Sequence, residues 1–92
     1  MKFEWDRQKA RANFSTHRIS FEEALTVFAD PLGRIHADPD HSSSENREIL
    51  IGHSARNRLL LVSFVERADA TRIISARQVT PQERNDYQEG IL

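Results

Sequence analysis

The chain has 92 residues, a formal net charge of −1 and no cysteine. A length near ~100 residues predicts one domain, here residues 1–92, and the lack of cysteine excludes a disulfide framework and thiolate metal sites. Residues 1–14 carry charges where a signal peptide has its apolar run, and no stretch has the length and apolarity of a membrane span. We therefore expect a cytoplasmic protein.

Arginine dominates the positive charge. Lys2 and Lys9 are the only lysines among 13 cations, which leaves 11 arginines. A guanidinium group pairs bidentately with phosphate or carboxylate, so the bias is compatible with phosphate recognition. A GC-rich genome that favours arginine codons is the simpler explanation on composition alone. The net charge does not indicate a nucleic-acid binder.

The N-terminal segment predicts a short strand and a helix. Residues 3–5 alternate between apolar and acidic and suit an edge strand, and Asp6 is a helix N-cap for a helix from Arg7 to Thr16. Ala10 and Phe14 are four residues apart and are expected to face the core together. At the same spacing, Lys9, Asn13 and His17 form a polar stripe.

A second helix begins after Ser20. Ser20 and Glu23 have the spacing of a capping box, and Asp30-Pro31 ends the helix. Its predicted buried face consists of Phe21, Ala24, Leu25 and Phe28. The polar run from His36 to Arg47 reads as a loop, with short strand character over Arg34 to Ala37.

Three strands follow, over Glu48 to Gly52, Leu59 to Glu66 and Thr71 to Arg77, and they predict an antiparallel meander. The middle strand is apolar on both faces, which suits a central strand covered on two sides. A capping box at Thr80 to Glu83 starts a last helix that Gly90 ends. We therefore predict a two-layer α+β domain, with two N-terminal helices and a C-terminal helix against a small, mainly antiparallel sheet.

The order and spacing of these segments resemble the BrnT family of type II toxins, which are similar in fold to the RelE-type messenger-RNA nucleases. The resemblance rests on FEWDRQKARANFSTH (3–17), ISFEEALTVFADP (19–31), ENREILIG (45–52), LLLVSFVER (59–67), RIISAR (72–77) and the ER pair before Tyr87. It implies a ribonuclease, dependent on the ribosome or not, that is neutralised by a cognate antitoxin, BrnA, which binds DNA through its own domain.

RNA can be cut without a metal when a base activates the 2′-hydroxyl, an acid protonates the leaving oxygen and cations stabilise the phosphate. A histidine side chain can take up or release a proton near neutral pH, so His17 is a candidate for proton transfer, and Lys9 on the same stripe suits phosphate contact. Both also fit ordinary roles. His17 stabilises a helix C-terminus, and Lys9 is a solvated helix residue.

Further candidates lie beyond the polar loop. Glu45 and Arg47 are two apart and suit a base and a phosphate clamp, or else form a surface ion pair. Arg72 and Arg77 bracket an otherwise apolar strand and suit phosphate contact or strand-end solvation. Tyr87 suits base stacking or plain packing. We expect the catalytic set to come from these residues together with Lys9 and His17.

A rival set, His36, Asp38, Asp40 and His41, has metal-ligand chemistry, but it lies in a loop-like run, and we expect no metal or cofactor. The leading hypothesis is thus a toxin that cleaves messenger RNA by metal-independent 2′-hydroxyl attack and inhibits translation, held in a hetero-oligomer with its antitoxin. The alternative is a non-catalytic module that binds protein or RNA through the same arginines.

Overall fold

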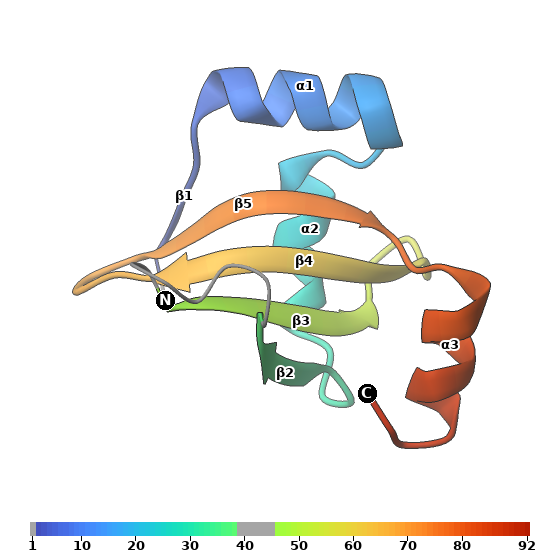
Figure 1. The fold of residues 1–92 in the computed structure, drawn as a ribbon. Coiled ribbons are helices and arrows are strands. Elements are labelled where there is room, and N and C mark those ends of the chain that lie inside the picture. The colour runs from blue at the N-terminus through green and yellow to red at the C-terminus, as the bar shows by residue number, and fades with distance from the viewer. Residues whose placement is uncertain (1, 39–45) are drawn as a thin grey trace.

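The computed structural model describes residues 2–38 and 46–92, and its elements follow the predicted order. The elements are β1 (Phe3–Glu4), α1 (Arg7–His17), α2 (Phe21–Val27), β2 (Arg34–Ala37), β3 (Arg47–His53), β4 (Leu59–Glu66), β5 (Thr71–Gln78) and α3 (Pro81–Gln88). The strands form one sheet in the order β1-β5-β4-β3-β2, and only β1 pairs in parallel (Figure 1). The predicted α+β class and the meander are confirmed.

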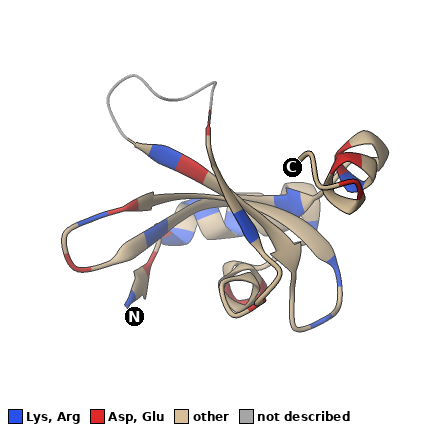
Figure 2. Ribbon diagram, turned by 90° about the horizontal axis from the view of Figure 1, so that it is seen from below, with Lys and Arg blue, Asp and Glu red and all other residues tan. Residues whose placement is uncertain are grey.

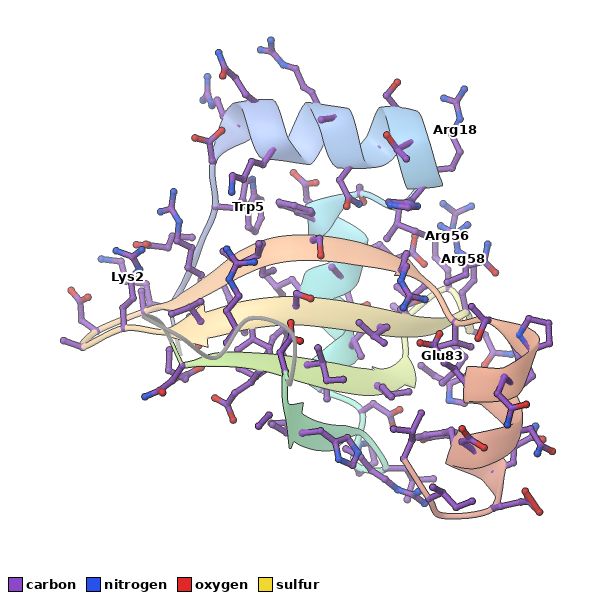
Figure 3. The ribbon with its side chains drawn as sticks, in the orientation of Figure 1. Lys2, Trp5, Arg18, Arg56, Arg58 and Glu83 are labelled. Atoms are coloured by element: carbon purple, nitrogen blue, oxygen red, sulfur yellow. The ribbon has the colours of Figure 1, made fainter. Side chains whose placement is uncertain are left out.

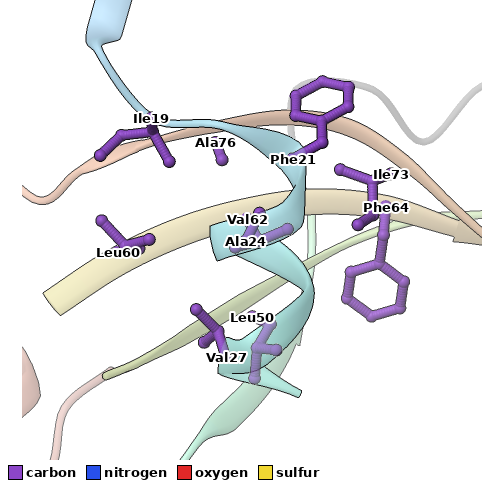
Figure 4. Close-up of a cluster of buried hydrophobic side chains, with 10 residues drawn as sticks. All are labelled: Ile19, Phe21, Ala24, Val27, Leu50, Leu60, Val62, Phe64, Ile73 and Ala76. Atoms are coloured by element: carbon purple, nitrogen blue, oxygen red, sulfur yellow. The ribbon is translucent and has the colours of Figure 1, made fainter. Parts of the chain in front are cut away.

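The main core lies between α2 and one face of the sheet. Leu60, Val62 and Phe64 of β4 point to this side and pack with Phe21 and Val27 of α2 (Figure 4). Burying each such side chain contributes roughly 1.5–3 kcal/mol. The intervening β4 residues form a smaller cluster on the opposite face, made of Leu59 and Leu61 with Ile51 and Tyr87. The middle strand of the predicted meander, β4, is therefore covered on both faces, as its apolar residues predict.

The β5 strand contains one extra residue. Ser63 pairs with Ser75 while the next β4 residue, Phe64, pairs with Ile73, so Ile74 has no partner across the ladder. Side chains alternate between faces along a regular strand, so two residues five apart would point in opposite directions. The bulge adds one position and cancels this effect. Arg72 and Arg77 therefore lie on the same face of the sheet, opposite the one that α2 covers.

Asn13 joins α1 to the edge of β5. Its amide nitrogen donates to the carbonyl oxygens of Ala76 and Ile19 at 2.8 and 2.9 Å, and its oxygen accepts from the Ala76 N–H at 3.1 Å. β1 pairs only with Thr71 and Arg72, so the amide takes the place of a strand partner at Ala76. Within the predicted polar stripe, Asn13 is thus buried, whereas Lys9 and His17 are exposed.

Phe14 corrects a prediction about α1. Its side chain was expected to face the core with Ala10, but it is 45% exposed. Because Asn13 has to face β5, the helical geometry turns the next residue about 100° away from the body. α1 is consequently attached by a polar anchor rather than by an apolar stripe.

The capping box expected at the start of α2 is only half formed. Ser20 accepts a hydrogen bond from the Glu23 N–H at 3.0 Å, but the Glu23 carboxylate turns to Arg58 and to the Ser54 hydroxyl, which donates at 2.7 Å. The Arg58 hydrogen bond, followed by that of Ser54, lowers the pKa of the buried Glu23. Glu23 therefore fastens α2 to the β3–β4 turn. The box at Thr80 is complete, as predicted.

Asn13→Ala should reduce the free energy of unfolding by about 2–4 kcal/mol, because it leaves buried backbone groups of Ala76 and Ile19 without partners. Gln8→Ala, at an exposed position of the same helix, should change it by less than about 0.5 kcal/mol. Urea unfolding monitored by circular dichroism measures both. Equal losses in the two variants would show that the Asn13 amide is not what holds α1.

Candidate functional site

The face of the sheet opposite α2 carries the candidate site, and we call it the open face. Figures 1 and 3 look onto it, with α2 behind the sheet. The pairing register sorts its side chains into three rows across the strands. The rows are Arg47, Val65 and Arg72; then His36, Ile49, Ser63 and Ser75; then Arg34, Ile51, Leu61 and Arg77. Arginines thus lie at both ends of the two outer rows, and the middle row has no arginine, with Ser63 and Ser75 on β4 and β5 and with His36 and Ile49 on β2 and β3.

Arg72 pairs with an acid from the neighbouring strand. Its guanidinium lies 3.0 Å from a carboxylate oxygen of Glu4, and the two side chains are 30% and 37% exposed. A pair exposed to this degree contributes little, about 0–1 kcal/mol. Phosphate can therefore compete for Arg72 at small cost. Arg47, in the same row, is half-buried.

Arg77 is held more firmly, by α3. Its two terminal nitrogens donate to the two carboxylate oxygens of Glu83 at 2.8 and 2.9 Å (Figure 3 labels Glu83). The Arg77 hydrogen bonds are the largest cause that lowers the pKa of Glu83 from 4.5 to about 2, and the Thr80 N–H adds to it. The same pairing raises the pKa of Arg77. The guanidinium is thus fixed in place at the rim of the open face.

Tyr87 closes the same end of the open face. Its ring is 9% exposed, and its hydroxyl donates to the Leu32 carbonyl at 3.1 Å. The Arg34 guanidinium lies 4.9 Å from the ring centroid and donates to the Tyr87 and Leu92 carbonyls. This environment shows the packing role for Tyr87 and leaves little of its ring for a base.

Lys9 and His17 lie apart from the other candidates. They line a shallow depression of about 330 Å³ between α1 and β5, with Thr16 and the bulge residue Ile74. Ile74 directly precedes Ser75 of the middle row, so the depression borders the open face at β5. Glu45 lies outside the described residues, as do Asp40 and His41 of the rival metal set.

The structure brings in residues that sequence patterns did not single out for catalysis. The strand register alone shows that Ser63, Ser75 and Arg34 lie on the open face. Arg72 and Arg77 share this face only because of the bulge. His36 enters the middle row, and its Nε2 is buried without a hydrogen-bond partner among the described residues. The one sequence signal for them is cross-strand pairing, which requires the register to be known.

Residues 2–38 and 46–92 contain no group of three His, Asp or Glu side chains that could hold a metal ion. No helix there has the length and apolar character needed to cross a membrane.

The fold is similar to that of a ribonuclease toxin whose structure has been solved. It matches the crystal structure of the ribonuclease toxin BrnT of Brucella abortus with a TM-score of 0.69 and 20% sequence identity, over 87% of this chain and 97% of that chain. No curated protein matches the sequence. The family described as "Ribonuclease toxin, BrnT, of type II toxin-antitoxin system" matches residues 5–83. The chain therefore belongs to the BrnT family of ribonuclease toxins, as the resemblance predicted.

The Glu83 pKa predicts an acid-dependent loss of stability. A carboxylate whose pKa is lower in the folded state stabilises the fold above its unfolded pKa, near 4.5, and this contribution is lost as the pH falls through about 2. The wild type should lose about 1–2 kcal/mol more than Glu83→Gln between about pH 5 and pH 2, after allowance for solvent screening.

The measurement is urea unfolding across this pH range, with Glu22→Gln as control because Glu22 is exposed on α2. If Glu83→Gln and the wild type lose stability in parallel, the Arg77–Glu83 pair does not supply the acid dependence.

Proposed function

We propose that this chain is an endoribonuclease that cuts messenger RNA on the open face and so inhibits translation. One observation carries the proposal: the β5 bulge puts Arg72 and Arg77 on the same face as Arg47, with the half-buried Ser63 and Ser75 in the row between them. Guanidinium groups set round hydroxyl side chains suit a phosphodiester, whose charge increases in the transition state. Membership of a ribonuclease toxin family supports the same reading.

The proposed reaction uses the nucleophile that RNA already carries. A base takes the proton of the 2′-hydroxyl, the 2′-oxygen attacks phosphorus, and the bond from phosphorus to the 5′-oxygen breaks. An acid returns a proton to that oxygen, which leaves a 2′,3′-cyclic phosphate and a 5′-hydroxyl end. Each proton removed is matched by one delivered, so the step needs no co-reactant.

We assign roles by chemistry and position. Arg72, Arg77 and Lys9 hold phosphate, with Arg47 as a further clamp. Glu45 and His17 are the proposed proton-transfer groups. Tyr87 positions Arg34 and the edge of the open face, because its hydroxyl and ring are engaged inside the fold.

We further propose that the metal-independent route operates. Charge stabilisation by several arginines supplies what a metal would otherwise supply at the phosphate. Cleavage should continue in EDTA and should stop on RNA with a 2′-deoxy sugar beside the scissile phosphate. Loss of activity in EDTA with recovery on adding a divalent cation would reject this route and direct attention to His36 and Asp38.

Type II toxins act within a toxin–antitoxin pair, so the family implies an antitoxin partner. We propose that this partner is BrnA-like, with its own DNA-binding domain, and that the toxin works in the cytoplasm, on free or ribosome-bound messenger RNA. Expression of the chain alone should arrest growth, and co-expression with the neighbouring gene's product should restore it. Normal growth with abundant folded protein would contradict the toxin function.

A non-catalytic binding module is the second candidate. It is favoured by the hydrogen bonds that Arg34, Arg72 and Arg77 each make to a carbonyl or carboxylate of the protein itself. Arginines held in place in this way can bind an anionic ligand without any chemical step. Purified, antitoxin-free protein distinguishes the two candidates, because only the enzyme converts RNA into products with cyclic phosphate ends.

Single-turnover kinetics should separate the roles. Arg72→Ala is expected to lower the cleavage rate by about 10²–10³-fold at every pH, since it removes charge stabilisation. His17→Ala and Glu45→Ala should lower it by about 10²–10⁴-fold and also alter the pH–rate profile.

The matched control is Arg84→Ala, an exposed arginine of α3 that belongs to none of the three rows. Equal rates for Arg72→Ala and Arg84→Ala would remove Arg72 from the site.

A further inference from the structure

Helix α1 has an unusual charge. Residues 7–18 contain Arg7, Lys9, Arg11 and Arg18 together with His17, and no acid. The rest of the chain therefore carries a net negative charge, since the whole has a formal charge of −1. Figure 2 shows acidic residues on α3 and on strands and turns of the sheet, where basic residues also occur. Residues 7–18 thus carry positive charge without an acid among them.

This charge does not serve the helix itself. Arg7 and Lys9 lie in the first turns, where the macrodipole disfavours cations, and the first turn has no acid of its own. Arg7 and Arg11 are four residues apart, a spacing at which like charges repel. Among the described residues, the side chains of Arg7, Lys9 and Arg11 make no hydrogen bond or ion pair. The sheet arginines Arg72 and Arg77, by contrast, are paired.

The helix also presents an aromatic ring among these cations. Phe14 is 45% exposed, and the Arg18 guanidinium lies 5.7 Å from its ring centroid. Both residues line a groove of about 450 Å³ between α1 and the start of α2, together with Arg11 and Phe21. Arg58 of the β3–β4 turn donates to the Arg18 carbonyl at 3.4 Å, so this turn lies at the end of α1. Cations beside an exposed aromatic ring are the usual platform for single-stranded nucleic acid.

α1 is placed to continue a path that starts on the open face. It runs beside β5 (Figure 1), and the depression with Lys9, His17 and Ile74 joins the two. All its residues except Ala10 and Asn13 are exposed, so the helix is free to contact a ligand along its length. A strand of RNA that crosses the open face therefore meets α1 next.

We propose that the face of α1 that carries Arg7, Arg11 and Phe14 is a second RNA-binding surface, which holds the single-stranded substrate outside the cleavage site through its phosphates and through stacking on Phe14. The inference rests on the proposed ribonuclease function but concerns binding of substrate beyond the scissile bond. An acidic protein segment is the other ligand that suits such a surface, and the experiment below separates the two.

The test is fluorescence anisotropy with a labelled single-stranded RNA carrying 2′-O-methyl groups, which 2′-hydroxyl attack cannot cut, at several salt concentrations. In Arg7→Gln/Arg11→Gln, the slope of log affinity against log salt should fall by about 1.4, since each phosphate contact on a single strand accounts for about 0.7. Phe14→Ala should weaken binding by about tenfold. Arg84→Gln on α3 should bind as the wild type does.

Two further measurements distinguish weaker RNA binding from misfolding and from loss of catalysis. The thermal midpoint of the double variant should not fall, because removing a like-charge pair does not cost stability. In cleavage assays the double variant should raise KM for long RNA and leave kcat/KM for a dinucleotide unchanged, because the dinucleotide reaches Lys9 and His17 but not Arg7 and Arg11, which lie on another face of α1.

Unchanged RNA affinity and salt slope in folded variants would overturn the proposal. So would unchanged RNA binding combined with lost affinity for the antitoxin, because the surface would then belong to the protein partner. RNA binding that depends on α1 in a chain that cuts no RNA would support this surface and reject the ribonuclease function instead.

Discussion

One extra residue in β5 determines what the open face can do. Without Ile74 in the bulge, the alternation of side chains would send either Arg72 or Arg77 into the apolar core beside Ile73 and Ala76. Burying an unpaired guanidinium there would cost several kcal/mol, so the bulge and the two arginines depend on each other. The same irregularity leaves Ile74 beside α1, where it helps to form the depression with Lys9 and His17.

The other constraint is the edge of the sheet. β1 is only two residues long, so most of β5 has no strand on the side opposite β4. The Asn13 amide makes the backbone hydrogen bonds of Ala76 on this side. A side-chain anchor of this kind holds α1 in place without using an apolar face. The helix can therefore expose its cations and Phe14. A helix that packs through a broad apolar stripe has less exposed surface. The β5 bulge thus positions the paired arginines Arg72 and Arg77, whereas the Asn13 contact positions the cations of α1.

Much of the fold was predictable because its signals are local. The caps at Asp6 and Thr80, the stop at Gly90 and the bounds of β4 follow from neighbouring residue types, and all are observed. The errors arose where a long-range contact overrode a local preference. Glu23 left its capping box for Arg58, and the contact of Asn13 with Ala76 turned Phe14 outward. The open face was only partly predictable, because neither the bulge nor the cross-strand rows can be read from one sequence.

The central claim is that RNA binds on the open face, with Arg72, Arg77 and Arg47 at the phosphates. The most direct measurement is an NMR titration of the arginine Nε–Hε signals with a non-cleavable single-stranded RNA. The account predicts that the signals of Arg72 and Arg47 shift at the lowest RNA concentrations, together with the backbone amides of Ser63 and Ser75. Shifts confined to α3 and the β3–β4 turn, with an unperturbed open face, would contradict it.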